Sequence, residues 1–443
     1  MQRFRYVLVD CLMALVLSVM VSFAAMADQP LTLREASSLA LSADPWLSGS
    51  IYREQALSDE AVAVATLPDP KINLAAANFP TDGFDHNQEP MTQLVVGVTQ
   101  IFPRGDTRAL SGKQKLQLAA QEPLRRLDRK AAARARVELF WLSAYEAQET
   151  IRLIDRERDL FNQLVDAARA RYVSAVGHTQ QQDLIRAQVE VTRLDDRLSR
   201  LVQQRQQAQR RLSEWIGARA LTDLATELPD NSTRISENEL RLLASDAQAT
   251  FEVLSAHPQL QVIDQQIAAL DTGVAIAEQQ YAPEWGLSAQ YGYRDDDPLG
   301  RSRADLFSVG VSFDVPMFTA NRQDKVVSAA SARVAALKTE KQLKIRTLVA
   351  DFQEEAVALS RLNERAVLFD TSLLPQMSAQ SASSLAAYNS DNGNFSDAVA
   401  ARIAELNSKI ERLGIAIAKQ KSASKIDYLL AGSGRENIED GVF

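Results

Sequence analysis

The sequence predicts a mainly α-helical protein with a small β part, built as an internal duplication. Long stretches rich in Ala, Leu, Arg, Glu and Gln indicate helices, and two pairs of short alternating segments indicate β-hairpins. When each residue is placed over the one 213 positions later, Pro70 falls on Pro283, Val96-Gly97-Val98 on Val309-Gly310-Val311, and Pro103 on Pro316. Proline and glycine mark the turns of a fold, so this coincidence indicates two equivalent halves.

Residues 1–27 have the pattern of a signal peptide. Arg3 and Arg5 precede an apolar run from Leu12 to Ala25, and Ala25-Met26-Ala27 fits a small-x-small cleavage site. We therefore expect an exported protein. Cleavage would remove Arg3, Arg5 and Asp10, so the formal net charge goes from −8 to −9 (−8 − 2 + 1), which argues against nucleic-acid binding.

The chain has one cysteine, Cys11, and it lies inside the apolar run of this signal peptide. The small residues of a lipoprotein cleavage site do not precede it, so we expect no lipid on Cys11. The mature chain then has no thiol, which excludes a disulfide scaffold and thiolate metal sites.

The first structural repeat is expected over residues 28–228. It begins with one helix from Thr32 to Thr66, with Thr32 as N-cap. A hairpin over 71–102 follows, with strands at Lys71–Phe79 and Gln93–Phe102. Long helices over 105–216 complete the repeat, with a kink expected at Pro123.

The second repeat is expected over 251–430, with a hairpin over 285–315 and long helices over 320–428. A capped, polar and irregular link, 229–250, joins the repeats, and 431–443 forms a C-terminal tail. Each repeat has a helical turn in which a tyrosine precedes a glycine at the same spacing, Tyr172 with Gly177 and Tyr388 with Gly393.

The hairpin over 285–315 separates apolar from polar side chains. Phe307, Val309, Val311 and Phe313 take one face of its second run, and Ser308, Gly310 and Ser312 take the other. Each run is as long as a tilted membrane strand, which has roughly 9 to 11 residues. A hairpin in a soluble sandwich shows the same alternation, so both interpretations stay open at this point.

No later stretch has the ~18 consecutive apolar residues of a spanning helix. A membrane protein of this sequence would need a closed barrel, because an open sheet leaves backbone groups unpaired in lipid. Four strands are too few, since small barrels use about eight. A symmetric homo-oligomer would complete the sheet and cover the long helices; otherwise the strands belong to a soluble sheet.

The segments PDPKINL, VTQIFPRGDTRAL, RYVSAVGHTQQQDL and AAYNSDNGNFSDAV, in this order and duplicated, resemble the TolC-like outer-membrane efflux proteins over essentially the whole mature chain. The resemblance implies a homotrimer in outer-membrane lipid, in which three copies of four strands close a twelve-stranded β-barrel. The helices would continue it as a periplasmic α-helical barrel, with most of the chain in the periplasm and the link as an equatorial belt.

The resemblance also implies a function, that of a passive outer-membrane exit duct of a tripartite efflux system. Its partners would be a periplasmic adaptor and an inner-membrane pump of the resistance-nodulation-division type. In its PDP turn and the absence of a lipid-bearing cysteine, the chain resembles the branch of this family that serves heavy-metal cation pumps more than the multidrug branch, which implies heavy-metal cations as cargo. A multidrug or type I protein secretion duct is the alternative. A soluble periplasmic coiled-coil structural protein is the alternative of another class.

We expect no enzyme activity, no cofactor and no resident metal ion. The sequence contains no nucleophile elbow, P-loop, dinucleotide fingerprint or metalloprotease motif. His86, His178 and His257 are far apart and show no metal-ligand spacing.

Candidate functional residues fall at the turns and on the hairpin. At the turns, the resemblance implies an adaptor-contacting tip, Val176, Gly177, Asn392 and Gly393; the alternative is that each glycine only supplies a positive φ. Nearby carboxylates are candidate gate residues, Asp183, Asp391 and Asp397, with N-capping as the alternative, especially for Asp397. On the hairpin we expect pore-lining side chains at Ser288, Gln290, Ser308 and Ser312, and lipid-facing ones at Trp285, Leu287, Val309 and Val311.

Overall fold

The computed structural model describes residues 29–174, 181–229, 235–390 and 392–434. The expected signal peptide, 1–27, lies outside these residues, as do Val176, Gly177, Asp391 and most of the expected tail.

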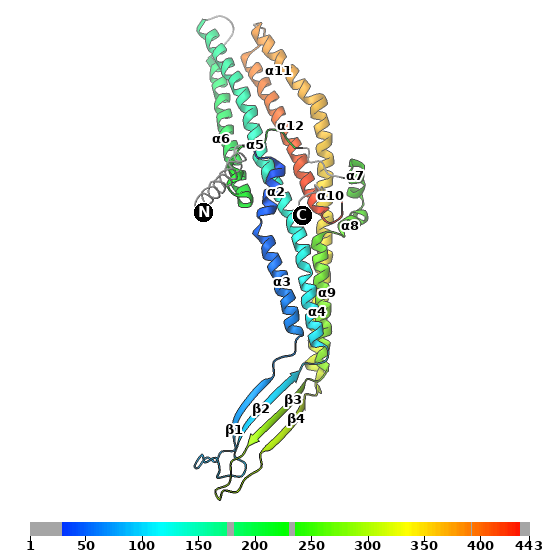
Figure 1. Cartoon of the computed structure of the whole chain (residues 1–443). Helices are drawn as coiled ribbons and strands as arrows, with labels where there is room; N and C mark the ends of the chain where they lie inside the picture. The colour runs from blue at the N-terminus through cyan, green and yellow to red at the C-terminus, as the bar shows by residue number, and fades with distance from the viewer. Residues whose placement is uncertain (1–28, 175–180, 230–234, 391, 435–443) are drawn as a thin grey trace, which may run out of the picture. The chain divides into compact units, whose positions relative to one another are not determined.

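The fold class is confirmed, because long helices dominate and the strands form one small sheet (Figure 1). In chain order the helices and strands are α2 (Leu33–Ala43), α3 (Pro45–Ala65), β1 (Lys71–Ala77), β2 (Gln93–Phe102), α4 (Thr107–Ala119), α5 (Gln121–Ser174), α6 (Gln181–Ile216), α7 (Glu237–Ser245), α8 (Ala247–Leu254), α9 (Pro258–Glu278), β3 (Trp285–Tyr293), β4 (Leu306–Phe313), α10 (Gln323–Leu368), a π-helical turn (Phe369–Leu373), α11 (Leu374–Asn389) and α12 (Phe395–Leu429). The division into two repeats stays a prediction.

The single helix expected from Thr32 to Thr66 is wrong, because the structure has two helices there. Thr32 is the N-cap as expected, and its hydroxyl accepts a hydrogen bond from the Glu35 amide at 3.1 Å. The helix then stops at Asp44, which is extended (φ −74°, ψ 105°). Pro45 explains the stop, because proline disfavours the helical conformation in the residue before it.

The long helix expected from Gly105 is also interrupted, but three residues before Pro123. Helix α4 ends at Ala119 and α5 begins at Gln121, so Pro123 lies in the first turn of α5. The missing amide hydrogen of a proline breaks no helical hydrogen bond in a first turn. The proline therefore follows the break and begins the next helix.

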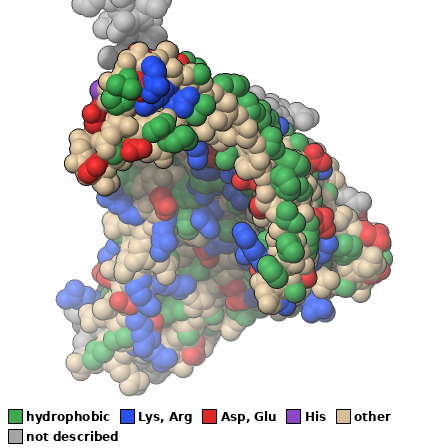
Figure 2. All heavy atoms as spheres, turned by 90° about the horizontal axis from the view of Figure 1, so that it is seen from below, with side chains coloured by type: hydrophobic (Ala, Val, Ile, Leu, Met, Phe, Trp, Pro, Cys, Tyr) green, Lys and Arg blue, Asp and Glu red, His purple; other side chains and the backbone are tan. Residues whose placement is uncertain are grey.

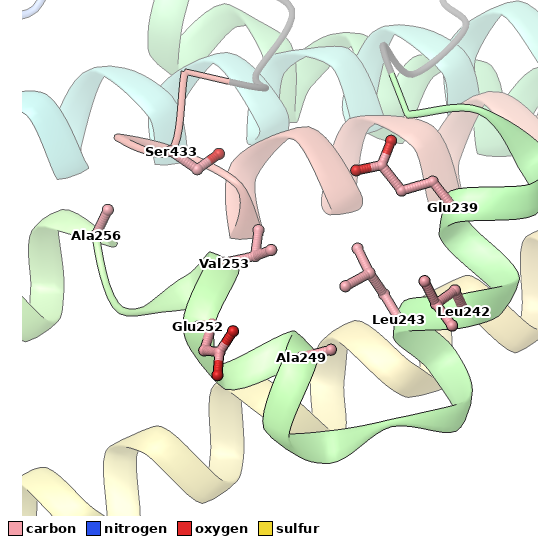
Figure 3. A pocket seen from close by; sticks show the side chains of 8 residues that line it. All are labelled: Glu239, Leu242, Leu243, Ala249, Glu252, Val253, Ala256 and Ser433. Carbon is pink, nitrogen blue, oxygen red and sulfur yellow. The ribbon is translucent and has the colours of Figure 1, made fainter.

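The link is not irregular, because it contains the two short helices α7 and α8. Ser236 caps α7 through the Glu239 amide at 3.3 Å, and Asp246 caps α8 through the amides of Gln248 and Ala249. A hollow of about 490 Å³ lies beside these helices (Figure 3). Its lining is apolar except for two carboxylates and one hydroxyl, from Glu239, Leu242, Leu243, Ala249, Glu252, Val253, Ala256 and Ser433.

The chain forms two compact units, and α5 and α10 each contribute residues to both. Unit 1 comprises 1–45, 127–257 and 345–443. At its centre Trp141 is fully buried, stacks on Tyr145 at 5.1 Å and donates its indole hydrogen to the Leu31 carbonyl at 3.1 Å. Leu31 also pairs with Leu224 through a parallel bridge. One aromatic side chain thus connects Leu31, near the start of the described chain, to the helical core.

Unit 2 comprises 46–126 and 258–344, and it contains the whole sheet. Its helices α4 and α9 pack closely, with Gln114 donating to the Ala269 carbonyl at 2.9 Å and Thr272 donating to Gln117 at 2.7 Å. These polar contacts fix the axial position of α4 relative to α9 next to the sheet.

Candidate functional site

The sheet has the order β1-β2-β3-β4, and all neighbouring strands are antiparallel. Both hairpins expected from the sequence are confirmed: Leu74 lies opposite Val96 in the first, and Leu287 opposite Val311 in the second. The hairpins also join each other, since β2 pairs with β3 and places Val96 opposite Tyr291. The four strands therefore form one continuous sheet.

One face of this sheet is apolar and exposed. Residues directly opposite each other share a face, so the register assigns the side chains of all four strands to it. The large hydrophobic side chains on this face are Ile72, Leu74, Leu94, Val96, Val98, Phe102, Trp285, Leu287, Tyr291, Tyr293, Phe307, Val309, Val311 and Phe313. Their exposed fractions run from 39% for Phe102 to 74% for Ile72 and Leu74. In Figure 2, hydrophobic side chains follow the outer side of the foremost, curved part of the molecule.

The opposite face of the sheet carries mostly polar and small side chains, with Val95, Ile101 and Leu306 as the large hydrophobic exceptions. It contains all four residues expected to line a pore, Ser288, Gln290, Ser308 and Ser312. All four residues expected to face lipid, Trp285, Leu287, Val309 and Val311, lie on the apolar face. The sequence alternation thus separates the two sets correctly, while their contact with water or lipid stays a prediction.

Glycines on the polar face make room for neighbouring polar side chains. A Cβ on Gly292 would lie 2.1 Å from the Gln93 side-chain oxygen, and one on Gly286 would lie 2.6 Å from the Ser312 hydroxyl. Glycine in a strand commonly marks such a close approach. The alternation of the first run places Gly286 and Gly292 on this face, but their close approaches to neighbouring side chains were not expected from the sequence.

The two outer strands each pair on one side only. β1 pairs with β2 and β4 pairs with β3, so the outer edges of β1 and β4 carry unpaired backbone groups within the described chain. An open edge is a template for pairing with another chain. A broad exposed apolar face is equally unfavourable in water. Pairing with further strands would give the backbone groups at the open edges hydrogen-bond partners. Contact with a non-polar medium would remove the apolar face from water.

The loops at one end of the sheet are joined to each other by polar contacts. His86, in the loop after β1, lies 2.6 Å from the Asp295 carboxylate in the loop after β3. Arg303 of the second loop donates to the Glu89 carbonyl of the first at 3.1 Å. At the opposite end Trp285 and Phe313 pack with ring centroids 4.9 Å apart. Polar contacts thus join the loops at one end of the sheet, and an aromatic pair lies at the other end.

The second helical turn joins α11 to α12. Its Asn392 and Gly393 are exposed, but Gly393 does not have the positive φ that was one explanation for a glycine here. A Cβ at this position would instead lie 2.9 Å from the Ala387 Cβ and 3.0 Å from the Tyr388 amide nitrogen. Glycine is required by the close approach of α11, and not by the backbone conformation.

The candidate gate carboxylates are only partly described. Asp397 is exposed in the first turn of α12, where Asn394 occupies the N-cap position, so N-capping by Asp397 is wrong. Asp183 lies in the first turn of α6. Asp391, like Val176 and Gly177, lies outside the described residues. Of the three carboxylates, the structure describes only that of Asp397, and the gate stays a prediction.

A buried charged cluster that was not expected lies between α5, α11 and α12. Glu157 and Glu405 are almost fully buried, and Arg402 and Lys409 each approach both carboxylates at 2.6 to 3.2 Å. Burial raises the pKa of Glu405, but hydrogen bonds from Lys409 and Ser381 outweigh it, so the pKa lies below its ordinary value. The spacing of residues 402, 405 and 409 on one helix face is the sequence signal for such a cluster.

The described residues include neither a metal-binding cluster nor a helix that could span a bilayer. No group of three or more His, Cys, Asp or Glu side chains there can hold a metal ion. None of the described helices is both long enough and apolar enough to cross a bilayer.

The chain is similar to solved outer-membrane channels over nearly its whole length. CusC, whose structures concern transmembrane channel formation, matches with a TM-score of 0.73 at 12% identity, over 90% of this chain and 92% of that one. The CmeC outer membrane channel of Campylobacter jejuni gives 0.72 at 12% identity, over 92% and 87%. The outer membrane protein VceC of Vibrio cholerae gives 0.70 at 15% identity, over 90% and 96%.

No protein-family model and no curated protein matches the chain. At these identities the structural similarity defines the fold, which is that of outer-membrane channel proteins. The fold expected from the resemblance is therefore confirmed, and function must be argued from the sheet.

Proposed function

We propose that this protein is a passive exit duct of the outer membrane, formed by three copies of the chain. The observation that carries the proposal is the exposed apolar face of a sheet with two open edges. In lipid, every backbone group needs a partner within the protein, so the free edges of β1 and β4 must meet other strands. Three copies of four strands close a barrel with its apolar face toward lipid and Ser288, Gln290, Ser308 and Ser312 toward the pore.

The same observation argues against a soluble periplasmic scaffold. Such a protein would expose fourteen large hydrophobic side chains on one sheet face to water. The helices do not discriminate between the two functions, because long amphipathic helices serve both. The similarity to solved outer-membrane channels supports the duct.

Fractionation followed by sizing in detergent tests the proposal. The mature chain is expected in the outer-membrane fraction, soluble only with detergent, with a protein mass of about three chains by light scattering. A monodisperse mature chain in detergent-free periplasmic extract would contradict the duct and support the scaffold.

We further propose that the duct works with a periplasmic adaptor and an inner-membrane pump, because a passive duct supplies no energy of its own. Heavy-metal cations are the proposed cargo, with drugs or secreted proteins as the alternatives. The turn at Asn392 and Gly393, with Val176 and Gly177, is the proposed contact for the adaptor. Metal tolerance of cells that lack the gene, compared with their tolerance to drugs, would separate the cargo classes.

Asp183, Asp391 and Asp397 are proposed to act together at the gate. In a trimer each becomes a ring of three carboxylates that attracts cations. Replacing Asp183 and Asp397 with Asn should lower the cation selectivity of single channels in planar bilayers. Unchanged selectivity would remove these residues from the gate while leaving the duct intact.

A further inference from the structure

The turn between α11 and α12 contains the only Asn-Gly pair of the chain, Asn392-Gly393. Both residues are exposed, and they lie between the end of α11 at Asn389 and the start of α12 at Phe395 (Figure 1). An asparagine followed by glycine is open to attack on its side-chain amide by the next backbone nitrogen, because glycine has no Cβ to block the approach. This reaction also requires that the local backbone leaves the glycine amide available.

The hydrogen bonds of the turn leave both reacting groups available. The Asn392 backbone amide donates to the Ala387 carbonyl at 3.0 Å, which holds the residue in place on its N-terminal side. Within the described residues, neither the Gly393 amide nor the Asn392 side chain makes a hydrogen bond. The attacking nitrogen and the side-chain carbonyl carbon therefore have no competing partner there.

Two asparagines that precede a serine have different surroundings, because both belong to helices. Asn407 lies inside α12, and its side-chain oxygen accepts a hydrogen bond from Arg197 at 2.7 Å. Asn389 is the last residue of α11, and the amide that follows it, from Ser390, donates to the Ala386 carbonyl at 3.1 Å. A helix directs each amide along its axis into such a hydrogen bond and away from the preceding side chain. The turn lacks this protection.

We propose that Asn392 is a site of spontaneous deamidation, with water as the only co-reactant. The Gly393 amide nitrogen forms a bond to the Asn392 Cγ, the Cγ–Nδ2 bond breaks, and ammonia leaves with the proton of the attacking nitrogen. Water then opens the resulting five-membered imide at one of its two carbonyl carbons. The products are aspartate and isoaspartate, each with a carboxylate in place of the neutral amide.

Both products change the turn. Each adds one negative charge per copy, a few residues before the exposed Asp397 in the first turn of α12. Isoaspartate also makes the main chain one atom longer. Since a Cβ on Gly393 would already lie 2.9 Å from the Ala387 Cβ, the longer backbone has no room unless the end of α11 moves. The chemistry does not depend on the proposed duct, because the turn belongs to a single chain.

Peptide mass spectrometry of the detergent-purified chain tests the site. During incubation at mildly alkaline pH, the peptide that contains Asn392 should gain the mass of an NH2 to OH exchange and separate into two chromatographic forms. Fragment sequencing assigns the change to one residue. Asn389 and Asn407 should keep their original mass over the same period. Equal modification of all three asparagines would contradict the inference, because the helices would then give no protection.

Asn392→Gln is the matched variant. It keeps a neutral, exposed side-chain amide, but its ring closure would have to form a six-membered imide, which is much slower. The variant should therefore keep its original mass at residue 392. Modification of the variant at the rate of the parent would show that the backbone of Gly393 is not the attacking group.

A synthetic peptide of residues 385–399 gives the rate of the reaction without the fold. A rate in the folded chain within about an order of magnitude of the peptide rate supports the inference, because the turn then leaves the pair accessible. A slower rate than this contradicts it, since the fold would protect Asn392.

Asn392→Asp separates the added charge from the longer backbone, because it has the charge and an ordinary main chain. The incubated parent should be cut faster at this turn by a protease than freshly purified Asn392→Asp. Equal cutting of the two would contradict the displacement of α11 by the longer backbone.

Discussion

Arg412 on α12 donates two hydrogen bonds to the Asp370 carboxylate, at 2.6 and 2.7 Å. Asp370 belongs to the π-helical turn that joins α10 to α11, next to Phe369, which is buried against Ile415 of α12. A π-helical turn widens the backbone and is rare outside positions with a specific role. The bidentate pair and the buried ring therefore hold this irregular turn against α12.

Replacing Asp370 with Asn should weaken that attachment. The hydrogen bonds from Arg412 lower the pKa of Asp370 below its ordinary 3.8. A lowered folded-state pKa means that the stabilisation is present above that ordinary value and is lost as pH falls through the folded pKa. We expect Asp370→Asn to cost roughly 0.5 to 1 kcal/mol at pH 7, and progressively less as pH falls through the folded-state pKa.

Thermal unfolding in detergent between pH 3 and 7 measures this effect. Glu364→Gln is the control, since Glu364 makes an exposed pair with Arg361 on its own helix. Equal stability of the Asp370→Asn variant and the parent at pH 7 would show that the pair is not needed to hold the turn.

Glu122 is the centre of a buried polar network at the start of α5. Ser50 donates to its carboxylate at 2.7 Å, and Arg125 and Arg53 approach at 2.9 and 3.2 Å. Burial raises the pKa of Glu122, but the Ser50 hydrogen bond and the two arginines together lower it below 4.5. Its stabilisation is therefore complete at neutral pH and is lost as pH falls below about 4.5.

Glu122→Gln should destabilise the protein by about 1 to 3 kcal/mol at pH 7, because the two arginines lose their buried partner. Chemical unfolding at pH 7 and pH 3.5 measures the change, which should shrink at the lower pH. Glu60→Gln, in an exposed pair with Lys115, should have a much smaller effect. A larger effect at pH 3.5 than at pH 7 would contradict the sign of the pKa shift.

Gly393→Ala should disturb the turn between α11 and α12. The added methyl group would have to displace Ala387 or the Tyr388 backbone, at an expected cost of about 1 to 3 kcal/mol. Gly414 on α12 is the matched control, because a Cβ there meets only the Glu146 side chain, at 3.8 Å. Gly414→Ala should be neutral or stabilising by up to about 1 kcal/mol. Proteolysis at the turn, which reports local opening, should increase only for Gly393→Ala.

Lysine scanning of β4 tests the two faces of the sheet. Val309→Lys places a charge on the apolar face, where it should reduce the amount of folded trimer in the outer membrane, at an expected cost of about 2 to 4 kcal/mol. Ser308→Lys, one residue away on the polar face, should assemble normally and lower the cation conductance of the channel. If Ser308→Lys lowers the membrane yield more than Val309→Lys does, the assignment of the two faces to lipid and pore is reversed.

The strands were predicted well because each side chain on them has one of two environments. Alternation of Val309 with Ser308 is a local pattern, and the register of the hairpins follows from it. The pairing of β2 with β3 is different, because residues such as Val96 and Tyr291 are brought together by helices that the pattern does not describe.

Helix interruptions and buried ion clusters were predicted less well. The stop at Asp44 depends on one proline against a strongly helical background. Nothing in the composition separates Glu405, buried between α12 and its neighbours, from the exposed Glu411 six residues later. A glycine at a turn can be required by a positive φ or by the close approach of neighbouring atoms. At Gly393 only the distance to Ala387 identifies the close approach as the reason.

The two open edges of the sheet have a genetic consequence. Under the proposed threefold arrangement every copy contributes to two seams, so one copy with a damaged edge spoils a whole complex. A cell that makes equal amounts of intact and damaged chain would have only about one fully intact complex in eight. Edge variants should therefore act as dominant inhibitors of export, whereas variants that prevent folding of the single chain should be recessive.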